Sequence, residues 1–470
     1  MGTINSAFNL ISSALDADQS ALSISANNVA NANTPGYTEE TPDWVENSPV
    51  EINGVAYGTG VTQTGPVSTR DRVLEERLDQ QQQLAAASNS RLTALNTVQA
   101  LFTPDSGTST GSAGDIGSDI TNFFDSFSAL EANPTDNALR QQVLSSATTL
   151  AGDISNAAAG LNAQKAALDQ EAAGVTSQVN ALTGAIAQLN QEIQSDSPHA
   201  DAGTLEDQRQ QDLSQLSQLI GINQVTTENN GLSVTTTSGQ LLVSEDSSFP
   251  LTDSLVGGVT HFFVGATDVT SQLETGGGQL GGYLTARDQD IPNALSSLDQ
   301  LAYSISTQVN TQNNAGTDLA GDNGGAGNIF AQPAAVAGSA IAMAVVMTDP
   351  NHIAAAAVGQ GTGDNSNATA MANLGSQTIV SGQTPSDYYS SFVSTLGSTV
   401  SNVQTENTAQ NASVTQLQTQ NDALSAVNLD DEASSMTELE RSYQAASQVF
   451  TMINSIMASA LNLGEQATVS

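Results

Sequence analysis

Few residues in this 470-residue chain have the types and spacing that catalysis or metal binding needs. Cysteine is absent, which excludes disulfide scaffolds, thiolate zinc sites and cysteine nucleophiles. The three histidines, His199, His261 and His352, lie far apart and form no HExxH motif or paired ligand spacing. We therefore expect no histidine metal site.

Two other segments match ligand-binding motifs only in part. The glycines at 276–278 and 281–282 are not followed by Gly-Lys-Ser/Thr, so they form no phosphate-binding loop. They should instead form the turn that leads into the helix expected at 280–313. Asp318, Asp322 and Asn323 are spaced partly like a calcium loop, but the twelve-residue ligand spacing fails. No motif isolates a pair among the many carboxylates. We predict a protein that is not an enzyme, without catalytic residues, cofactor or metal.

The charge of the chain limits its partners. It has 48 acidic and 9 basic residues, a net charge of -39. Nucleic-acid binding needs clustered Lys and Arg, so we expect no nucleic-acid partner. The first basic residue is Arg70, and no cleavable signal peptide is visible. The longest apolar stretch, Ala340 to Met347, is too short to span a bilayer, which predicts no membrane insertion; it should form a buried strand or helix.

Heptad spacing predicts an amphipathic helix at each end of the chain. The first covers about residues 3–31, and the second begins near Asn428 and ends at Gly464. The recurring positions are Phe8, Leu15, Leu22 and Val29; Met436, Tyr443, Phe450 and Met457; and Leu439, Ala446, Ile453 and Ala460. Burying a large apolar side chain stabilises by roughly 1.5–3 kcal/mol, so each apolar seam needs a partner.

Two interpretations of these seams stay open. The terminal helices could pair with each other inside one chain, or they could be buried only when subunits pack into a polymer. The two are compatible, because paired termini could form the inner wall of a tube. Tyr37 and Tyr443 could likewise fill a packed layer or contact a neighbouring subunit.

Periodicity predicts several elements between the terminal helices. An extended arm with short strands should follow over residues 37–67. Further helices are expected near residues 69–101, 116–131, 135–159, 161–195, 204–220, 280–313 and 385–424. Residues 222–275 are rich in Val, Thr and Gly with partial alternation, which predicts a β-rich module. Residues 314–384 should form loops and short strands.

Two terminal motifs resemble the signatures of a known family. Residues 23–37 read SISANNVANANTPGY, close to the pattern NNxANxxTxGY. Residues 426–464 read AVNLDDEASSMTELERSYQAASQVFTMINSIMASALNLG. Together they are similar to the N- and C-terminal signatures of the bacterial flagellar rod, hook and hook-associated axial proteins. Residues 123–154, 205–222, 277–302 and 363–374 resemble segments of the hook-associated member that joins hook to filament.

The resemblance implies a structural flagellar protein, exported by the type III apparatus without a cleaved signal peptide and located outside the cell at the hook–filament junction. It implies a self-assembled adaptor ring, with the hook protein and a second junction protein as further partners. A small export chaperone would hold the C-terminal helix. The predicted assembly residues are Phe8, Ile11, Leu15, Leu22, Val29, Asn28, Asn31, Tyr37, Met436, Leu439, Tyr443, Phe450, Ile453 and Met457.

The predicted fold is mainly α with a β-rich insertion: an elongated multi-domain axial protein with paired terminal coiled-coil helices and a discontinuous helical rod domain. Its expected domains are, in order, residues 1–67 (helix and arm of the inner tube domain), 68–221 (first part of the rod), 222–279 (β-rich outer module), 280–424 (second part of the rod, with the irregular 314–384 segment) and 425–470 (C-terminal helix of the inner tube domain). Alternatives are a hook or distal rod protein, which should lack the 123–154 and 205–222 segments, and a secreted coiled-coil adhesin or effector.

Overall fold

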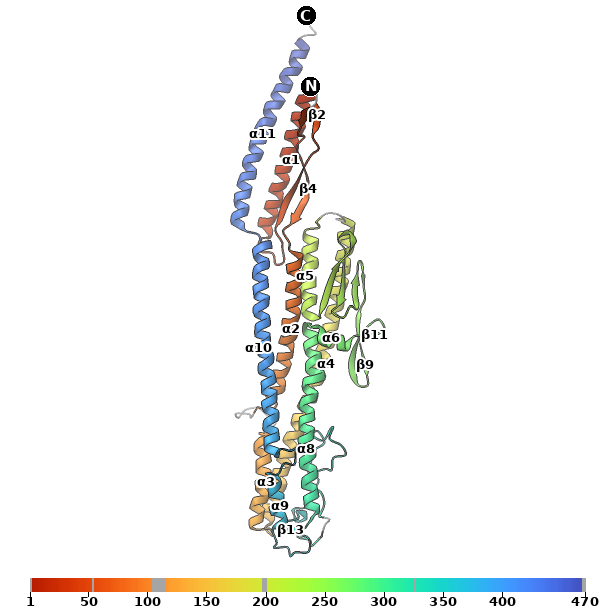
Figure 1. Ribbon diagram of the computed structural model, residues 1–470, viewed down its shortest axis with the longest axis vertical. Coiled ribbons are helices and arrows are strands. Elements are labelled where there is room, and N and C mark those ends of the chain that lie inside the picture. Colours follow the sequence, from red (N-terminus) through yellow and green to blue (C-terminus); the bar gives the residue numbers. More distant parts are fainter. Residues whose placement is uncertain (1, 53–54, 104–114, 197–200, 324–325, 467–470) are drawn as a thin grey trace.

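The computed structural model describes residues 2–52, 55–103, 115–196, 201–323 and 326–466. The molecule is elongated, with both ends of the chain at the same end of the rod (Figure 1). Its helices are α1 (Gly2–Asn31), α2 (Arg72–Ala100), α3 (Ile116–Ala132), α4 (Asn137–Asp196), α5 (Thr204–Leu219), α6 (Thr270–Gly276), α7 (Gly278–Thr285), α8 (Ile291–Asn314), α9 (Ser366–Leu374), α10 (Pro385–Ser425) and α11 (Leu429–Gln466). The predicted class, mainly α with a β-rich insertion and paired terminal helices, is confirmed.

The strands form small antiparallel sheets. They are β1 (Glu40–Glu46), β2 (Val50–Ile52), β3 (Val55–Tyr57), β4 (Val61–Ser68), β5 (Ile222–Thr226), β6 (Leu232–Thr236), β7 (Leu241–Ser244), β8 (Ser247–Ser248), β9 (Leu251–Val256), β10 (Val259–Val264), β11 (Thr267–Asp268), β12 (Gly316–Thr317) and β13 (Ala356–Ala357). The arm pairs β1 with β4, and the β-rich module holds the sheets β5-β6-β7-β8 and β11-β10-β9. In β10 every second residue is buried, so its alternation reflects one packed face.

Two cores hold the rod together. The larger one joins α2, α3, α4, α8 and α10, and Phe123 lies at its centre, within 5.5 Å of the Phe330 ring and 5.4 Å of the Phe127 ring. The smaller one packs the β-rich module on α4 and α5, for example through Val179 and Phe262. Because α4 contributes to both cores, it connects the β-rich module rigidly to the rod.

The expected break between helices at residues 135–159 and 161–195 is wrong, because α4 is one helix of 60 residues. Gly160 lies against the end of α2, where an added Cβ would be 2.9 Å from the Leu101 Cδ2. The glycine therefore permits a close approach of two helices instead of ending one.

Three other expectations need correction. Residues 340–347 form neither a helix nor a strand; a single bridge pairs Val345 with Phe330, and Ala340 and Met343 are buried against the larger core. The 314–384 segment contains a helix, α9, that was not predicted. The last helix continues through Gly464 to Gln466, because helical backbone bonds tolerate an isolated glycine.

Candidate assembly surface

The first and last helices of the chain pack against each other. Figure 1 shows α1 and α11 side by side beyond the end of α2 and α10. The rings of Phe8 and Phe450 lie 4.9 Å apart between their centroids. On α11 the half-buried positions are Met436, Leu439, Ala446, Phe450, Ile453 and Met457, all members of the predicted heptad series. The interpretation in which the termini pair within one chain is therefore the arrangement seen.

A second apolar row on α11 is left uncovered beside this seam. Val449, Met452 and Ile456 are 38%, 57% and 55% exposed. Their three- and four-residue spacing places them along one side of the helix. Complete burial of such side chains would stabilise by roughly 1.5–3 kcal/mol each before the costs of association. The helix pair thus offers an apolar surface that the chain does not itself cover.

Asn28 ties the base of this helix pair together. It is 1% exposed. Its side-chain oxygen accepts hydrogen bonds from the Tyr37 hydroxyl (2.7 Å) and the Glu40 backbone N–H (3.1 Å). Its amide nitrogen donates to the Glu40 carbonyl (2.8 Å) and to the carboxylate of Glu432 on α11. These four bonds fill the capacity of the amide and join α1, the arm and α11 at one point.

Backbone and ionic contacts fix this base on the rod. The backbone N–H of Glu39 donates to the Ser425 carbonyl at the end of α10 (2.9 Å). The N–H of Thr38 donates to the Asp207 carboxylate of α5 (3.2 Å), which also pairs with Arg70. Both charged side chains of this pair are largely buried. The terminal helices are thus held to the rod by a polar joint, which is more directional than an apolar one.

Burial at this joint weakens two acids of α2. It raises the pKa of Glu75 to about 7, although the nearby Arg70 lowers it in part. Burial also raises the pKa of Asp79 to about 6, against the effect of hydrogen bonds from Gln210 and Gln224. These groups change charge near neutral pH, so the joint is an electrostatically sensitive part of the molecule.

The predicted assembly residues fall into three groups. The inner seam residues on both helices are half-buried, as are Asn31 and Tyr37. Val29 and Tyr443 are exposed at 40% and 38%. Asn28 is buried and engaged within its own chain. Their contact with other subunits stays a prediction.

Sequence reasoning missed the partners at the joint. Glu40 and Asp207 carry no spacing signal that would single them out, and Glu432 stands in the C-terminal motif without any signal that connects it to Asn28. Asn28 and its partner Glu432 are 404 residues apart in sequence, so only the fold brings them together.

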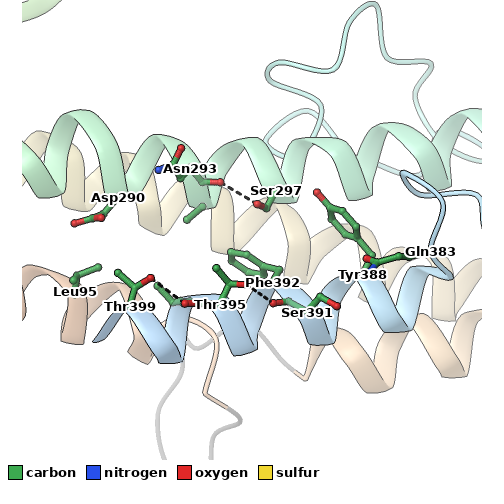
Figure 2. Close-up of a pocket in the computed structure, with 12 residues that line it drawn as sticks. Leu95, Asp290, Asn293, Ser297, Gln383, Tyr388, Ser391, Phe392, Thr395 and Thr399 are labelled. Carbon is green, nitrogen blue, oxygen red and sulfur yellow. Dashed lines mark hydrogen bonds between the residues drawn. The ribbon is translucent and has the colours of Figure 1, made fainter. Parts of the chain in front are cut away.

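A cavity of about 300 Å³ between α8 and α10 has no arrangement suited to catalysis. Figure 2 shows the hydroxyls of Ser297, Thr395 and Thr399 along its walls. Each hydroxyl donates to a carbonyl of its own helix four residues earlier. Asp290 at one end is paired with Arg91 (2.8 Å). These four polar groups are therefore engaged within the fold.

One cluster could hold a metal ion. Among the residues that the structure describes, Asp318, Asp322 and His352 are the one group of three such side chains with ligand atoms within 4.8 Å of one another. His352 lies far from the two aspartates in the sequence, so residue spacing did not predict that the three side chains form a cluster. Among the described helices, none is long and apolar enough to cross a membrane.

Three family models match the chain in the order expected for a flagellar axial protein. The "Flagella basal body rod protein" model matches residues 8–38, and the "Flagellar basal body rod FlgEFG protein C-terminal" model matches residues 419–463. Between them, the "Flagellar hook-associated protein FlgK helical domain" model matches residues 105–330.

Individual relatives match over nearly the whole chain. Flagellar hook-associated protein 1 of Escherichia coli is 24% identical, with 98% of this chain and 100% of the relative covered. The protein of the same name from Bacillus subtilis is 26% identical over 96% of both. The structure of the flagellar hook junction protein FlgK from Burkholderia pseudomallei has a similar fold, with a TM-score of 0.65 at 18% identity, over 73% of this chain and 99% of that one. The ordered matches to terminal and helical models, over the full length of these relatives, show that the chain belongs to the flagellar hook-associated protein 1 (FlgK) family of structural proteins of the hook–filament junction.

Proposed function

We propose that this protein works as an adaptor ring between hook and filament, and that it does so by assembly, without catalysis. The observation that carries the proposal is the terminal helix pair, which leaves the row Val449, Met452 and Ile456 uncovered. In the ring, this row would be buried on α1 or α11 of a neighbouring subunit. Residues 1–67 and 425–470 would then form the inner tube, and the β-rich module at 222–279 would project outward.

The surroundings of the helix pair support this assignment. An uncovered apolar row is a poor surface for an isolated protein in water and a good one for a polymer. The polar joint around Asn28 sets the direction of the pair relative to the rod, as a repeating assembly needs. The net charge of -39 keeps free subunits apart until an apolar contact of defined geometry forms.

The same assembly role implies the partners and the location of the protein. The ring would contact the hook protein on one side and a second junction protein on the other. Before export, a small chaperone would cover the apolar row of α11 in the cytoplasm. The protein would then leave the cell through the flagellar type III apparatus without cleavage of a signal peptide. We propose no nucleic-acid partner and no membrane insertion.

A triple variant of the outer row tests the assembly surface. Val449→Ser, Met452→Ser and Ile456→Ser together should leave the circular dichroism spectrum unchanged but abolish incorporation at the hook tip. Cells should then carry hooks without filaments and shed flagellin into the medium. The matched control replaces exposed apolar residues of β9, Leu255→Ser and Val256→Ser, and should assemble normally. Normal filaments on the triple variant would contradict the proposal.

The outer row is a cleaner test than the inner seam. Phe450 contacts Phe8 of the same chain, so an Asp at position 450 would open the helix pair itself. Loss of assembly would then report damage to the subunit as much as loss of an interface.

Electron microscopy of a strain that lacks the gene tests the location. Complete hooks without filaments, with free flagellin in the medium, are expected. Missing hooks would instead place the protein in the hook or rod. Normal flagella would favour a secreted coiled-coil adhesin.

A further inference from the structure

We propose that Asp318, Asp322 and His352 bind a divalent transition-metal ion such as Zn²⁺. The cluster lies beside β12 and β13, at the end of the rod opposite the chain termini (Figure 1). It is therefore remote from the helix pair, and its function does not depend on the assembly role.

Two chain segments bring the three side chains together. Asp318 and Asp322 lie in the turn after β12, where the Asp322 N–H donates to the Asp318 carboxylate (2.9 Å). His352 ends a short 3-10 helix, Pro350–His352. The Leu319 N–H donates to the Asn351 carbonyl (3.0 Å), which fixes the two segments to each other. The ligand positions are therefore set by backbone bonds and not by flexible side chains alone.

The spacing of the donor atoms suits a small metal ion. The Nδ1 of His352 lies 2.7 Å from an Asp318 carboxylate oxygen, and all three ligand atoms lie within 4.8 Å of one another. Metal bonds of about 2.0–2.2 Å to nitrogen and carboxylate oxygen place donor atoms roughly 3–4 Å apart. The His352 and Asp318 donor atoms would have to move apart by roughly 0.3–1.3 Å to admit an ion, with water in the remaining positions.

The local charge favours a divalent cation. The carboxylates of Asp318, Asp322 and Asp349 all act on the His352 imidazole. The nearby cation is the buried Arg140, whose guanidinium donates to the carbonyls of Pro134, Pro350 and Ile353. With His352 neutral, three negative charges and one positive charge leave a net charge of -2, which one divalent ion would neutralise.

The donor set selects the class of metal. An imidazole nitrogen with carboxylates suits Zn²⁺ and its neighbours in the first transition row, whereas Ca²⁺ and Mg²⁺ prefer sites made of oxygen alone. A bound ion would link the 318–322 turn to the 350–352 segment and stiffen this end of the rod.

The chain contains its own control. His261 makes the same contact with Asp268, also at 2.7 Å, on the β-rich module. Within the part of the chain that the structure describes, no third ligand completes that pair. If a histidine–aspartate pair on an acidic protein were enough, both sites would bind Zn²⁺ equally.

The test is calorimetric titration of Zn²⁺ into the full chain. Every protein carries His199→Gln, so that His261 and His352 supply the only imidazoles. His352→Gln and Asp322→Asn change exposed or half-exposed side chains and should fold normally. Each should weaken the tightest Zn²⁺ site about tenfold or more, whereas His261→Gln should leave it unchanged. Zn²⁺ should also raise the melting temperature of the His261→Gln protein and not that of the His352→Gln protein.

The opposite results would overturn the proposal. Equal Zn²⁺ affinity in the two histidine variants would mean that only the acidic surface binds the ion. Absence of a saturable site would mean that the aspartates serve the turn alone. Tighter binding of Ca²⁺ than of Zn²⁺, unaffected by His352→Gln, would exclude the imidazole as a ligand.

Discussion

Replacing Glu75 with Gln should stabilise this protein above pH 7. Burial raises the pKa of Glu75 from 4.5 to about 7 in the folded state. Between these two values the folded chain keeps a proton that the unfolded chain has lost, so the free energy of unfolding falls as the pH rises and levels off above about 7. At roughly 1.4 kcal/mol per pH unit, the loss amounts to about 3 kcal/mol. Gln resembles the protonated acid and carries no such loss.

Urea denaturation followed by circular dichroism at pH 5 and pH 8 measures this effect. The variant should be more stable than the natural sequence by about 3 kcal/mol at pH 8 and by less than about 1 kcal/mol at pH 5. Glu76→Gln is the control, because it makes the same charge change at the next, half-exposed position of α2. A variant that is less stable than the natural sequence at pH 8 would refute the reasoning, since the ion pair with Arg70 would then outweigh burial.

Three further predictions concern the helices. Trypsin should cut first at the exposed Arg441, releasing residues 442–470, because α11 is held by one half-buried seam, whereas the other exposed arginines, Arg72 and Arg77, lie on α2, which packs against α5, α7 and α10. Mass spectrometry of early fragments checks this, and protection of Arg441 would mean that α11 is held more firmly than its half-buried seam implies. Gly174→Ala should raise the free energy of unfolding by about 1 kcal/mol, because a Cβ at this position of α4 meets nothing within 4 Å. Gly160→Ala should raise it less, because the added Cβ meets Leu101. Equal changes in the urea midpoint of the two variants would argue against a close approach at Gly160. Asn28→Ala should cost about 2–3 kcal/mol of unfolding free energy because it leaves buried partners unbonded. Asn31→Ala should cost clearly less in the same assay, because its side-chain amide bonds only the nearby, exposed Asn27 and Thr34.

The helical elements were largely predictable because their signals are local. The series Met436, Tyr443, Phe450 and Met457 predicts a helix with one apolar seam whatever its partner is, since the period of the side chains is fixed by the backbone. The structure agrees for α11, apart from the end at Gln466. The break expected at residue 160 is wrong, because Gly160 admits a neighbouring helix, and the sequence does not distinguish that role from ending a helix.

The candidate site was predictable only in part, for a related reason. The motif around Asn28 marks the position as special, but its four bonds depend on Glu40 and Glu432, which no local pattern connects to it. The uncovered row of Val449, Met452 and Ile456 was also hidden, because exposure depends on how far α1 reaches around α11.

The sequence by itself determined the helix-rich class, the two terminal seams and the flagellar family signatures, because periodicity and short motifs are properties of neighbouring residues. Tertiary structure alone decided between the two interpretations of the terminal seams, let Asn28 join three segments, and placed Asp318, Asp322 and His352 together. These outcomes depend on contacts between residues tens to hundreds of positions apart. Such contacts follow from the packing of whole helices, and no single segment of the chain encodes them.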